Sequence, residues 1–510
     1  MTSTVSERDT LARDALAVLQ PTFAGTTTLP DWLPRQMENG LTAVGLFGRN
    51  VVSPEQVAAL TARLRAVRPE VMVAVDEEGG DVTRLEVRGG SSFPGNHALG
   101  SVDDPELTRA VAAELGRRLA AAGITLNWAP SADINSDPAN PVIGVRSFGE
   151  DPALVARHTV AYVEGLQSAG VAACVKHFPG HGNTAVDSHL ALPRIDIGTD
   201  TLYARELVPF RAAVRAGTRA VMSAHILLPA LDPERPGTLS RAVLTGLLRA
   251  PAAEGGLGFE GLIVSDALEM RAIADAYGLE GGSVLAVAAG ADALCVGGTP
   301  SDEAEVLRLR DALVAAVRSG ELPEERLHDA AERVRALARW TTRARERAGG
   351  AAPDGEIGLT AARRALRVSH PAGEAAWAPP ASPAYVASFA PAANSAAGEE
   401  TPWGLGPELA RLLPGTAHGR HAGHDPAALA AEVLRAAGQR PVVAVVRDVH
   451  RHPWMAAALA AVLAARPGTA VVEMGLPHAP PAGALHIATH GAARVCGRAA
   501  AEVIAGRRAA

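Results

Sequence analysis

One short stretch of the chain gathers side chains that can move protons. Lys176 and His177 come first, His181 follows after a Phe-Pro-Gly turn, and Asp187 and His189 stand two residues apart shortly afterwards. A carboxylate that reaches a nearby imidazole can orient one ring nitrogen and raise its basicity, as in general acid–base catalysis. Glycine and proline are frequent in the stretch, which favours a loop over a helix.

Lys176 is the only lysine of the chain, although lysine and arginine together number 48. A lysine carries a compact ammonium with three donors, whereas an arginine carries a wide planar fork. A position that keeps lysine in so arginine-rich a chain therefore indicates a need for a small cation in a narrow space. Chance is the alternative, since a single lysine must stand somewhere.

Three other interpretations of the histidine loop remain open at this point. His177, His181 and His189 could be metal ligands, but the loop offers no Cys or Glu beside them, which fits a zinc site poorly. They could also be structural loop histidines. A glycine-rich loop can cradle phosphate, but no helix start follows directly, so that interpretation is weak.

Carboxylates that follow apolar runs form a second candidate group. The apolar residues 262–264 lead to Asp266, and an Asp at a strand end can attack the anomeric carbon of a sugar. A helix N-cap is an equal alternative for such an Asp. Asp76 follows another apolar run and could accept hydrogen bonds from sugar hydroxyls, to which Arg84 and Arg146 could donate.

Eight short apolar runs, each followed by a helix-like segment, would have to position these residues. They are residues 17–19, 43–47, 71–75, 124–128, 171–175, 220–223, 262–264 and 291–296. Continuous apolar runs fit strands buried on both faces, as in a parallel sheet. Eight strand–helix units over about 300 residues predict an α/β fold of the TIM type, a (β/α)8 barrel, with a doubly wound open sheet as the alternative.

Polar residues follow five consecutive runs. They are Asp76-Glu77-Glu78, Asp133 with Asn135, Lys176-His177, His225, and Ser265-Asp266. In a barrel all these positions fall at the carboxyl ends of the strands, where active sites are built. Packing alone does not require such a pattern, so it predicts a site at this end.

The predicted domain order is a catalytic barrel over residues 1–346, a helix and linker over 347–383, and a smaller C-terminal α/β sandwich-like domain over 384–510. Residues 323–346 fit the last barrel helix, a further helix is expected near 359–367, and 371–383 is rich in Ala and Pro, as linkers often are. Strands of the C-terminal domain are expected at 384–389, 442–446, 469–473 and 485–488. This domain shows no catalytic cluster.

The composition argues against several classes of protein. A net charge of -7, a pI of about 6.2 and dispersed charges do not fit a nucleic-acid partner. No membrane span is predicted, and the N-terminus lacks the pattern of a signal peptide. The three cysteines, Cys174, Cys295 and Cys496, are far apart and odd in number, which favours reduced thiols in a cytoplasmic protein.

Together these blocks resemble glycoside hydrolase family 3, most closely its bacterial β-N-acetylglucosaminidases, over roughly residues 10–345. The matching stretches are 75–80, 127–135, 146–149, 176–182, 187–189 and 265–270. The most specific is Lys-His-Phe-Pro-Gly-His-Gly combined with Asp-Ser-His. Relatives that act on glucosides usually lack this Asp-Ser-His and take a glutamate acid/base from the second domain.

The resemblance implies a role for each matching position. Asp266 would be the nucleophile, His189 the acid/base, and Asp187 the residue that orients His189. The terminal sugar would be bound by Asp76, Arg84, Arg146, Lys176 and His177. Two positions depart from the family pattern: Asp81, where Arg is frequent, puts a negative charge near the sugar site, and Ala267 stands where a second acidic residue is usual.

The hypothesis is a retaining exo-β-N-acetylglucosaminidase that removes terminal β-linked GlcNAc without a metal or organic cofactor. The expected partner is a small carbohydrate, a muropeptide or a chitin fragment, rather than nucleic acid or a membrane, and the expected setting is cytoplasmic recycling of peptidoglycan. One alternative is a β-N-acetylglucosaminide phosphorylase, because a histidine acid/base repels phosphate less than a carboxylate would. The others are a β-glucosidase-like family member and a sugar-binding barrel without catalysis.

Overall fold

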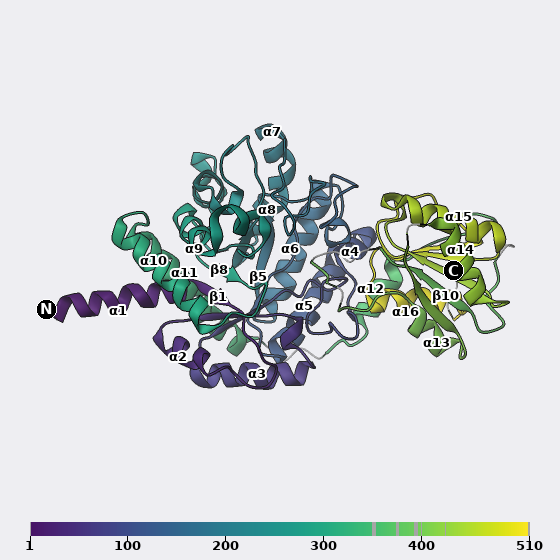
Figure 1. Ribbon diagram of the computed structural model, residues 1–510, viewed down its shortest axis with the longest axis horizontal. Helices are drawn as coiled ribbons and strands as arrows, with labels where there is room; N and C mark the ends of the chain where they lie inside the picture. Colours follow the sequence, from purple (N-terminus) through teal and green to yellow (C-terminus); the bar gives the residue numbers. More distant parts are fainter. Residues whose placement is uncertain are drawn as a thin grey trace. The chain divides into compact units, whose positions relative to one another are not determined.

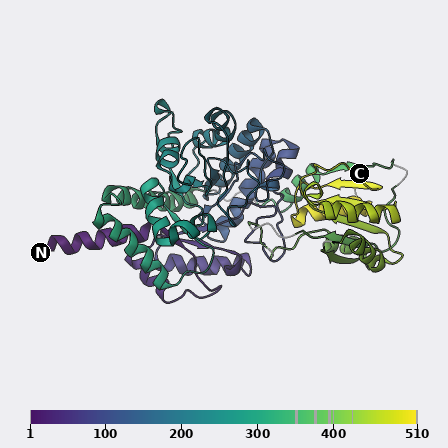
Figure 2. The ribbon, with the colours of Figure 1, turned by 45° about the horizontal axis from the view of Figure 1, so that its top comes forward.

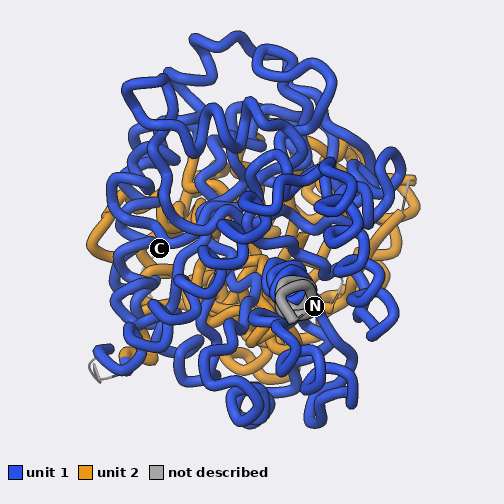
Figure 3. The backbone as a smooth tube through the Cα atoms, turned by 90° about the vertical axis from the view of Figure 1, so that its left-hand side faces the viewer, with its two compact units in different colours: residues 1–78, 108–143, 150–353 blue, residues 79–107, 144–149, 354–510 orange. Residues whose placement is uncertain are grey.

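The computed structural model describes residues 2–348, 353–373, 377–391, 396–398, 400–423 and 425–507. Its chain divides into two compact units (Figure 3). Unit 1 consists of Met1–Glu78, Thr108–Ile143 and Glu150–Pro353, and unit 2 of Gly79–Leu107, Gly144–Gly149 and Asp354–Ala510. The predicted domain boundaries at residues 346 and 383 stay a prediction, and residues 349–352 and 374–376 of the predicted linker lie outside the described residues.

Unit 1 is a barrel of parallel strands. These are β1 (Leu19–Pro21), β2 (Ala43–Leu46), β3 (Met72–Val75), β4 (Leu126–Asn127), β5 (Ala172–Phe178), β6 (Ala220–Ser223), β7 (Leu262–Val264) and β8 (Leu294–Val296). β2 to β7 form one sheet in chain order, β1 pairs with β8, and a bridge between Val264 and Ala293 joins β7 to β8. Because β1 also lies against β2, the ring closes. The predicted barrel is confirmed, although its first strand begins two residues later than expected.

Helices surround the strands of unit 1 (Figures 1 and 2). They are α1 (Thr2–Ala17), α2 (Trp32–Asn39), α3 (Pro54–Val67), α5 (Pro105–Ala121), α6 (Pro152–Ser168), α8 (Leu207–Arg215), α9 (Arg271–Ala289), α10 (Glu303–Ser319) and α11 (Glu324–Arg347). Ser53, Asp151 and Asp302 cap α3, α6 and α10 by accepting a backbone N–H of the first turn, a contact worth about 1 kcal/mol. Within the described part of the chain, no helix is both long and apolar enough to cross a bilayer.

Small and flexible side chains fill the inside of the barrel. They include Ala43, Met72, Ala74, Ala172, Cys174, Ala220, Met222, Ala293 and Cys295, all buried in one cluster. Trp128 is the large exception in this cluster, and its ring packs on Phe47 with centroids 5.9 Å apart. A chain with 4% aromatic residues thus fills the inside of its barrel mostly with short side chains.

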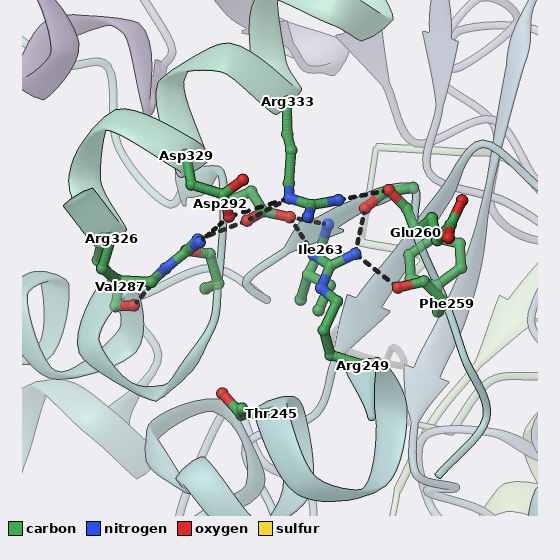
Figure 4. Close-up of polar contacts among 12 residues, drawn as sticks. Thr245, Arg249, Phe259, Glu260, Ile263, Val287, Asp292, Arg326, Asp329 and Arg333 are labelled. Atoms are coloured by element: carbon green, nitrogen blue, oxygen red, sulfur yellow. Dashed lines mark hydrogen bonds and ion pairs between the residues drawn. The ribbon is translucent and has the colours of Figure 1, made fainter. Parts of the chain in front are cut away.

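A buried ion-pair network holds the amino-terminal end of β8 (Figure 4). Asp292 is fully buried, and its Oδ2 accepts from Arg249 at 2.6 Å and from the Ile263 N–H at 2.9 Å. Its Oδ1 accepts from Arg326 of α11 at 2.5 Å, and Arg249 also donates to the Phe259 carbonyl at 2.7 Å. One carboxylate therefore ties the starts of β7 and β8 to α11, at the end of the barrel opposite the carboxyl ends of its strands.

Unit 2 is a sheet covered by helices on both faces. Its strands are β9 (Arg367–Ser369), β10 (Tyr385–Phe389), β11 (Ala417–His421), β12 (Val442–Val446), β13 (Ala470–Glu473) and β14 (Leu485–Ala488), in the order β11-β10-β12-β13-β14-β9. Only β9 pairs antiparallel among them. The helices α14 (Pro426–Ala437) and α15 (Pro453–Ala465) pack on one face, and α12 (Ile357–Ala365), α13 (Gly406–Leu412) and α16 (Arg494–Ile504) on the other. The predicted α/β sandwich is confirmed, with two strands that the sequence analysis did not predict.

Within unit 2, the segment Gly79–Leu107 is held at the carboxyl ends of the parallel strands. Asp81 pairs with Arg447, which follows β12, and accepts from the Ala492 N–H, which follows β14, at 2.7 Å. Doubly wound sheets bind ligands at this edge, where the strand order reverses. Here the order reverses between β10 and β12, and a segment of the chain itself bonds to the loops at that edge.

Candidate active site

The carboxyl ends of the strands in unit 1 carry most of the candidate residues. Asp76 follows β3 directly, Lys176 and His177 lie in the last part of β5, and Asp266 comes two residues after β7. His189 lies on the loop that leaves β5. Since all the strands of one parallel barrel point the same way, these positions share one face.

Lys176 is buried between two carboxylates. Its side chain is 3% exposed, and its Nζ lies 2.5 Å from Asp76 Oδ1 and 2.7 Å from Glu78 Oε1. Two carboxylates offset the cost of burying one ammonium. Asn127 of β4 holds the intervening turn, because its side chain donates to the Glu77 carbonyl at 2.7 Å and accepts the Glu77 N–H at 3.0 Å. Glu78 was not among the residues predicted for the site, although it follows Asp76 by two residues.

Asp133, fully buried after β4, organises the start of the histidine loop. Its Oδ2 accepts from His177 Nδ1 at 2.6 Å and from the Ser131 hydroxyl at 2.9 Å, and its Oδ1 accepts the His181 N–H at 2.7 Å. Burial raises the pKa of Asp133, but His177 foremost brings this pKa well below its usual range. An ionised Asp133 bonded to Nδ1 fixes the tautomer and the orientation of the His177 ring.

His181 connects this network to the loop that carries the predicted acid–base pair. Its Nε2 lies 3.0 Å from Ser188 Oγ, and Ser188 is buried and stands between Asp187 and His189 in the chain. Burial, and then the nearby His177, lowers the pKa of His181 to about 4. The His181 ring is therefore neutral near pH 7, and its bond to Ser188 anchors the loop to the barrel.

Asp187 and His189 make the contact that their spacing suggests. His189 Nδ1 lies 2.7 Å from Asp187 Oδ1, and the same oxygen accepts the His189 backbone N–H at 2.9 Å. The Asp187 side chain is buried, whereas that of His189 is 35% exposed. A carboxylate on Nδ1 leaves Nε2 as the nitrogen that can give or take a proton, and the catalytic role of the pair stays a prediction.

Asp266 has the charge state that an attacking carboxylate needs. Its Oδ1 accepts the Ala267 N–H at 2.8 Å. Burial would raise the pKa of Asp266, but the imidazoles of His225, His177 and His189 outweigh it and hold that pKa below its usual value. The carboxylate is thus ionised at neutral pH, as nucleophilic attack requires.

The three loop histidines make side-chain contacts that a shared metal site would compete with. His177 bonds Asp133, His181 bonds Ser188, and His189 bonds Asp187. Among the residues that the structure describes, no group of three or more His, Cys, Asp or Glu side chains is placed to hold a metal ion.

Arg84 and Arg146, the two arginines expected at the sugar, belong to unit 2. Arg84 donates to the Ala396 carbonyl at 2.7 Å, beyond the end of β10. Arg146 is buried, and its carbonyl accepts from the Asn96 side chain at 2.7 Å. Their role toward a sugar stays a prediction. Asp81, expected to put a negative charge near the sugar, is paired with a cation inside unit 2.

A TIM-type barrel that carries an oriented imidazole and an ionised carboxylate at the carboxyl ends of its strands has the parts of a glycoside hydrolase. Residues 26–337 match the glycosyl hydrolase family 3 N terminal domain. The chain belongs to this family.

Three relatives show how far the likeness extends. The structure of a glycoside hydrolase family 3 β-N-acetylglucosaminidase from Paenibacillus sp. str. FPU-7 is 34% identical, with a TM-score of 0.83 over 98% of this chain and 97% of that one. Beta-hexosaminidase A of Pseudoalteromonas piscicida is 34% identical over 62% of this chain and 56% of its own length. The beta-hexosaminidase of Stenotrophomonas maltophilia (strain K279a) is 38% identical over 49% of this chain and 73% of its own length. The chain thus spans little more than half the length of the Pseudoalteromonas relative.

Proposed function

We propose that this protein is a retaining exo-β-N-acetylglucosaminidase that removes terminal β-linked GlcNAc. The observation that carries the proposal is the oriented His189–Asp187 pair on the same barrel face as an ionised Asp266. The choice of sugar is supported by the relatives, which include a family 3 β-N-acetylglucosaminidase and two β-hexosaminidases.

The reaction takes place in two displacements. First, Asp266 attacks the anomeric carbon while His189 gives its Nε2 proton to the glycosidic oxygen, so the aglycone leaves as an alcohol and a glycosyl ester of Asp266 forms. Then His189 takes a proton from water, the water oxygen bonds to the anomeric carbon, and the Asp266 carboxylate is released. An imidazole can serve as the acid in the first step and as the base in the second.

Binding of the terminal sugar belongs to the same proposal and falls to Asp76, Arg84, Arg146, Lys176 and His177. The Lys176–Asp76 pair supports this assignment, because it offers a hydroxyl one donor and one acceptor side by side. Glu78 balances the remaining charge of the ammonium.

The nucleophile is tested by Asp266→Ala. Hydrolysis of an aryl β-N-acetylglucosaminide should fall by about 10⁴-fold or more, since no other group would form the glycosyl ester. Asp275→Ala is the matched control, because Asp275 is an exposed residue of α9. A near wild-type rate for Asp266→Ala would refute the assignment.

The acid role is tested by His189→Ala with leaving groups of different acidity. An alkyl aglycone needs a proton to depart, whereas dinitrophenolate does not, so the alkyl substrate should lose about 10²-fold or more and the dinitrophenyl substrate much less. An equal loss for both substrates contradicts an acid role for His189.

Phosphorolysis is the second candidate, and the observation that favours it is the His189–Asp187 contact, which supports an imidazole rather than a second carboxylate as the acid/base. An imidazole does not repel an incoming phosphate as a second carboxylate would. The mass of the product formed in phosphate buffer separates the reactions: GlcNAc indicates hydrolysis and GlcNAc 1-phosphate indicates phosphorolysis. A preference for aryl glucosides over N-acetylglucosaminides would instead indicate a β-glucosidase-like enzyme.

The proposal extends to the recycling of cell-wall muropeptides in the cytoplasm, with chitin fragments as the other substrate class. All three cysteines are free and buried, which fits a reducing compartment. A panel of muropeptides and chitooligosaccharides, together with fractionation of the producing cells, tests both parts. Activity found outside the cells, or on chitooligosaccharides alone, contradicts them.

A further inference from the structure

His225, a buried histidine outside the predicted set of site residues, has a ring whose tautomer can be derived from its bonds. It follows β6 and is fully buried, and its Nε2 lies 2.9 Å from the Ala267 carbonyl oxygen. A carbonyl oxygen can only accept, so Nε2 carries a hydrogen. The other ring nitrogen, Nδ1, lies 2.8 Å from Thr238 Oγ1.

The hydroxyls of Thr238 and Ser223 extend the bonds of His225 into a chain of hydrogen bonds, here called the relay, in which the donor of each bond is fixed. When the ring is neutral and carries its hydrogen on Nε2, Nδ1 is an acceptor, and the Thr238 hydroxyl must donate to it. Thr238 Oγ1 can then accept from Ser223 Oγ, which lies 2.8 Å away at the end of β6. Thr238 and Ser223 are fully buried, so water does not compete with them for the ring.

The relay ends at the residue that follows Asp266. Ala267 accepts from His225 through its carbonyl and donates through its own N–H to Asp266 Oδ1 at 2.8 Å. Both polar groups of the Ala267 backbone are therefore fixed, one by the imidazole and one by the carboxylate. A change in the His225 ring would move the residue to which Asp266 is bonded.

We propose that Ser223, Thr238 and His225 are positioning residues that hold a neutral imidazole in its Nε2–H tautomer and thereby fix the Asp266 carboxylate for attack. The inference rests on the proposed role of Asp266 as the nucleophile. A neutral ring matters because a cation fixed beside the nucleophile would resist the loss of negative charge that accompanies attack. The ionisable groups facing His225 are Asp266, His189 and His177, and burial, against the pull of Asp266, lowers the His225 pKa.

Two substitutions at Thr238 separate the relay from simple packing. Thr238→Val keeps the shape and removes the hydroxyl, so Nδ1 loses its donor, and the rate of glycosyl-enzyme formation should fall about tenfold with KM little changed. Thr238→Ser keeps the hydroxyl and loses a methyl group, and it should retain the wild-type rate within about twofold. A wild-type rate in Thr238→Val, or equal losses in both variants, overturns the proposal.

A spectroscopic readout tests the tautomer without reference to activity. Nitrogen-15 spectra of the full-length protein labelled in histidine, assigned by comparison with His225→Gln, should show a neutral ring with hydrogen on Nε2 at pH 7, and this ring should become charged only at a lower pH than an ordinary imidazole. In Thr238→Val, or in Ser223→Ala if the first variant does not fold, part of the population should leave this state. A charged ring or an Nδ1–H tautomer in the wild type at pH 7 overturns the proposal. Retained hydrolysis by Asp266→Ala would instead refute the proposed function and leave the tautomer result unaffected.

Discussion

At the scale of single residues, the site is built from pairs in which one member fixes the other. Asp187 orients His189, Asp133 orients His177, and Asp76 with Glu78 surrounds Lys176. In each case a carboxylate holds a nitrogen donor at 2.5–2.7 Å, and all of these carboxylates except the partly exposed Asp76 are buried, so the donor group reaches the site already oriented. Such a pair fits a cation of one shape only. A lysine and an arginine carry the same charge, but they differ in shape and cannot replace each other in such a pair.

The lone lysine gives a direct test of this argument. Lys176→Arg keeps the positive charge but places a wide fork where a compact ammonium touches two carboxylates, and its surroundings leave the side chain 3% exposed. We expect kcat/KM on an aryl β-N-acetylglucosaminide to fall about 10²-fold. Arg271→Lys on the exposed surface of α9 is the matched control and should change kcat/KM by less than about twofold. If Lys176→Arg behaves like the control, the lysine has no special role.

At the scale of elements, the two ends of the barrel strands have different roles: the proposed site lies at one end, and a structural ion-pair network lies at the other. The carboxyl ends carry the residues proposed for catalysis, whereas the amino-terminal ends of β7 and β8 are joined to α11 through Asp292. Arg249 and Arg326 donate hydrogen bonds to Asp292 and to backbone carbonyls. The Asp292 network therefore fixes the amino-terminal end of β7, the strand that leads to Asp266.

Removing the charge of Asp292 should therefore cost stability rather than chemistry. Asp292→Asn leaves two partly buried guanidinium groups without the fully buried carboxylate that they share, and the free energy of unfolding should fall by about 3 kcal/mol or more. Urea unfolding measures the change, with Asp275→Asn on the exposed side of α9 as control. A loss below about 0.5 kcal/mol contradicts a central role for the network.

The elements that the sequence predicts well are those with a continuous apolar run, and the ones it misses lack this signal. β12 and β14 are buried along their whole length, and both were predicted. β11 reads Ala-His-Gly-Arg-His with alternate residues exposed, and β9 has no buried residue. Both are edge strands, which need less apolar surface because one side has no partner strand.

The site shows a similar division: contacts between residues close in the sequence could be predicted, and contacts between residues far apart could not. Asp187 and His189 are two residues apart, so their contact follows from the sequence. Asp133 follows β4 and His177 lies in β5, 44 residues further along the chain, and neither segment alone indicates that the two side chains bond. The position of Asp133 after its strand could be predicted from the sequence, but its partner could not.

A histidine pair in unit 2 makes stability depend on pH in one direction. His97 of α4 (Asn96–Val102) and His490, which follows β14, bring their Nδ1 atoms to 3.2 Å. Burial foremost lowers the pKa of His97 to about 4 and that of His490 to about 3, whereas an unfolded imidazole has a pKa of about 6.5. Above this value both states are neutral and pH has no effect through the pair. Below it the unfolded chain binds protons that the native state refuses, so stability falls as the pH drops.

We expect the free energy of unfolding to fall between about pH 6.5 and pH 4 by roughly 1 kcal/mol per pH unit for each of the two imidazoles. Urea unfolding at several pH values measures the slope. Replacing His490 with Gln should flatten it, whereas the same change at the exposed His418 should not. A slope that is unaltered by the His490 change contradicts the assignment.

At the scale of the whole molecule, the chain is not two units in a row. It leaves unit 1 after Glu78 and returns at Thr108, then leaves again after Ile143 and returns at Glu150. These two excursions carry Arg84 and Arg146, the arginines proposed to bind the sugar. The backbone of both arginines is therefore held within unit 2.

A chain cut after residue 353 should not behave as an independent barrel. The segment Gly79–Leu107 would lose Arg447 and Arg494, which pair with Asp81 and Glu86, and α4 would lose its packing on α12. We expect the fragment 1–353 to show a Tm lower than that of the full chain by about 10 °C or more, because several kcal/mol of contacts disappear, and to lose activity on the aryl substrate. Adding residues 354–510 as a separate chain provides the control, and it should recover part of both. A fragment that keeps the full Tm and rate would show instead that the two excursions fold without residues 354–510, and that Arg84 and Arg146 do not depend on these residues.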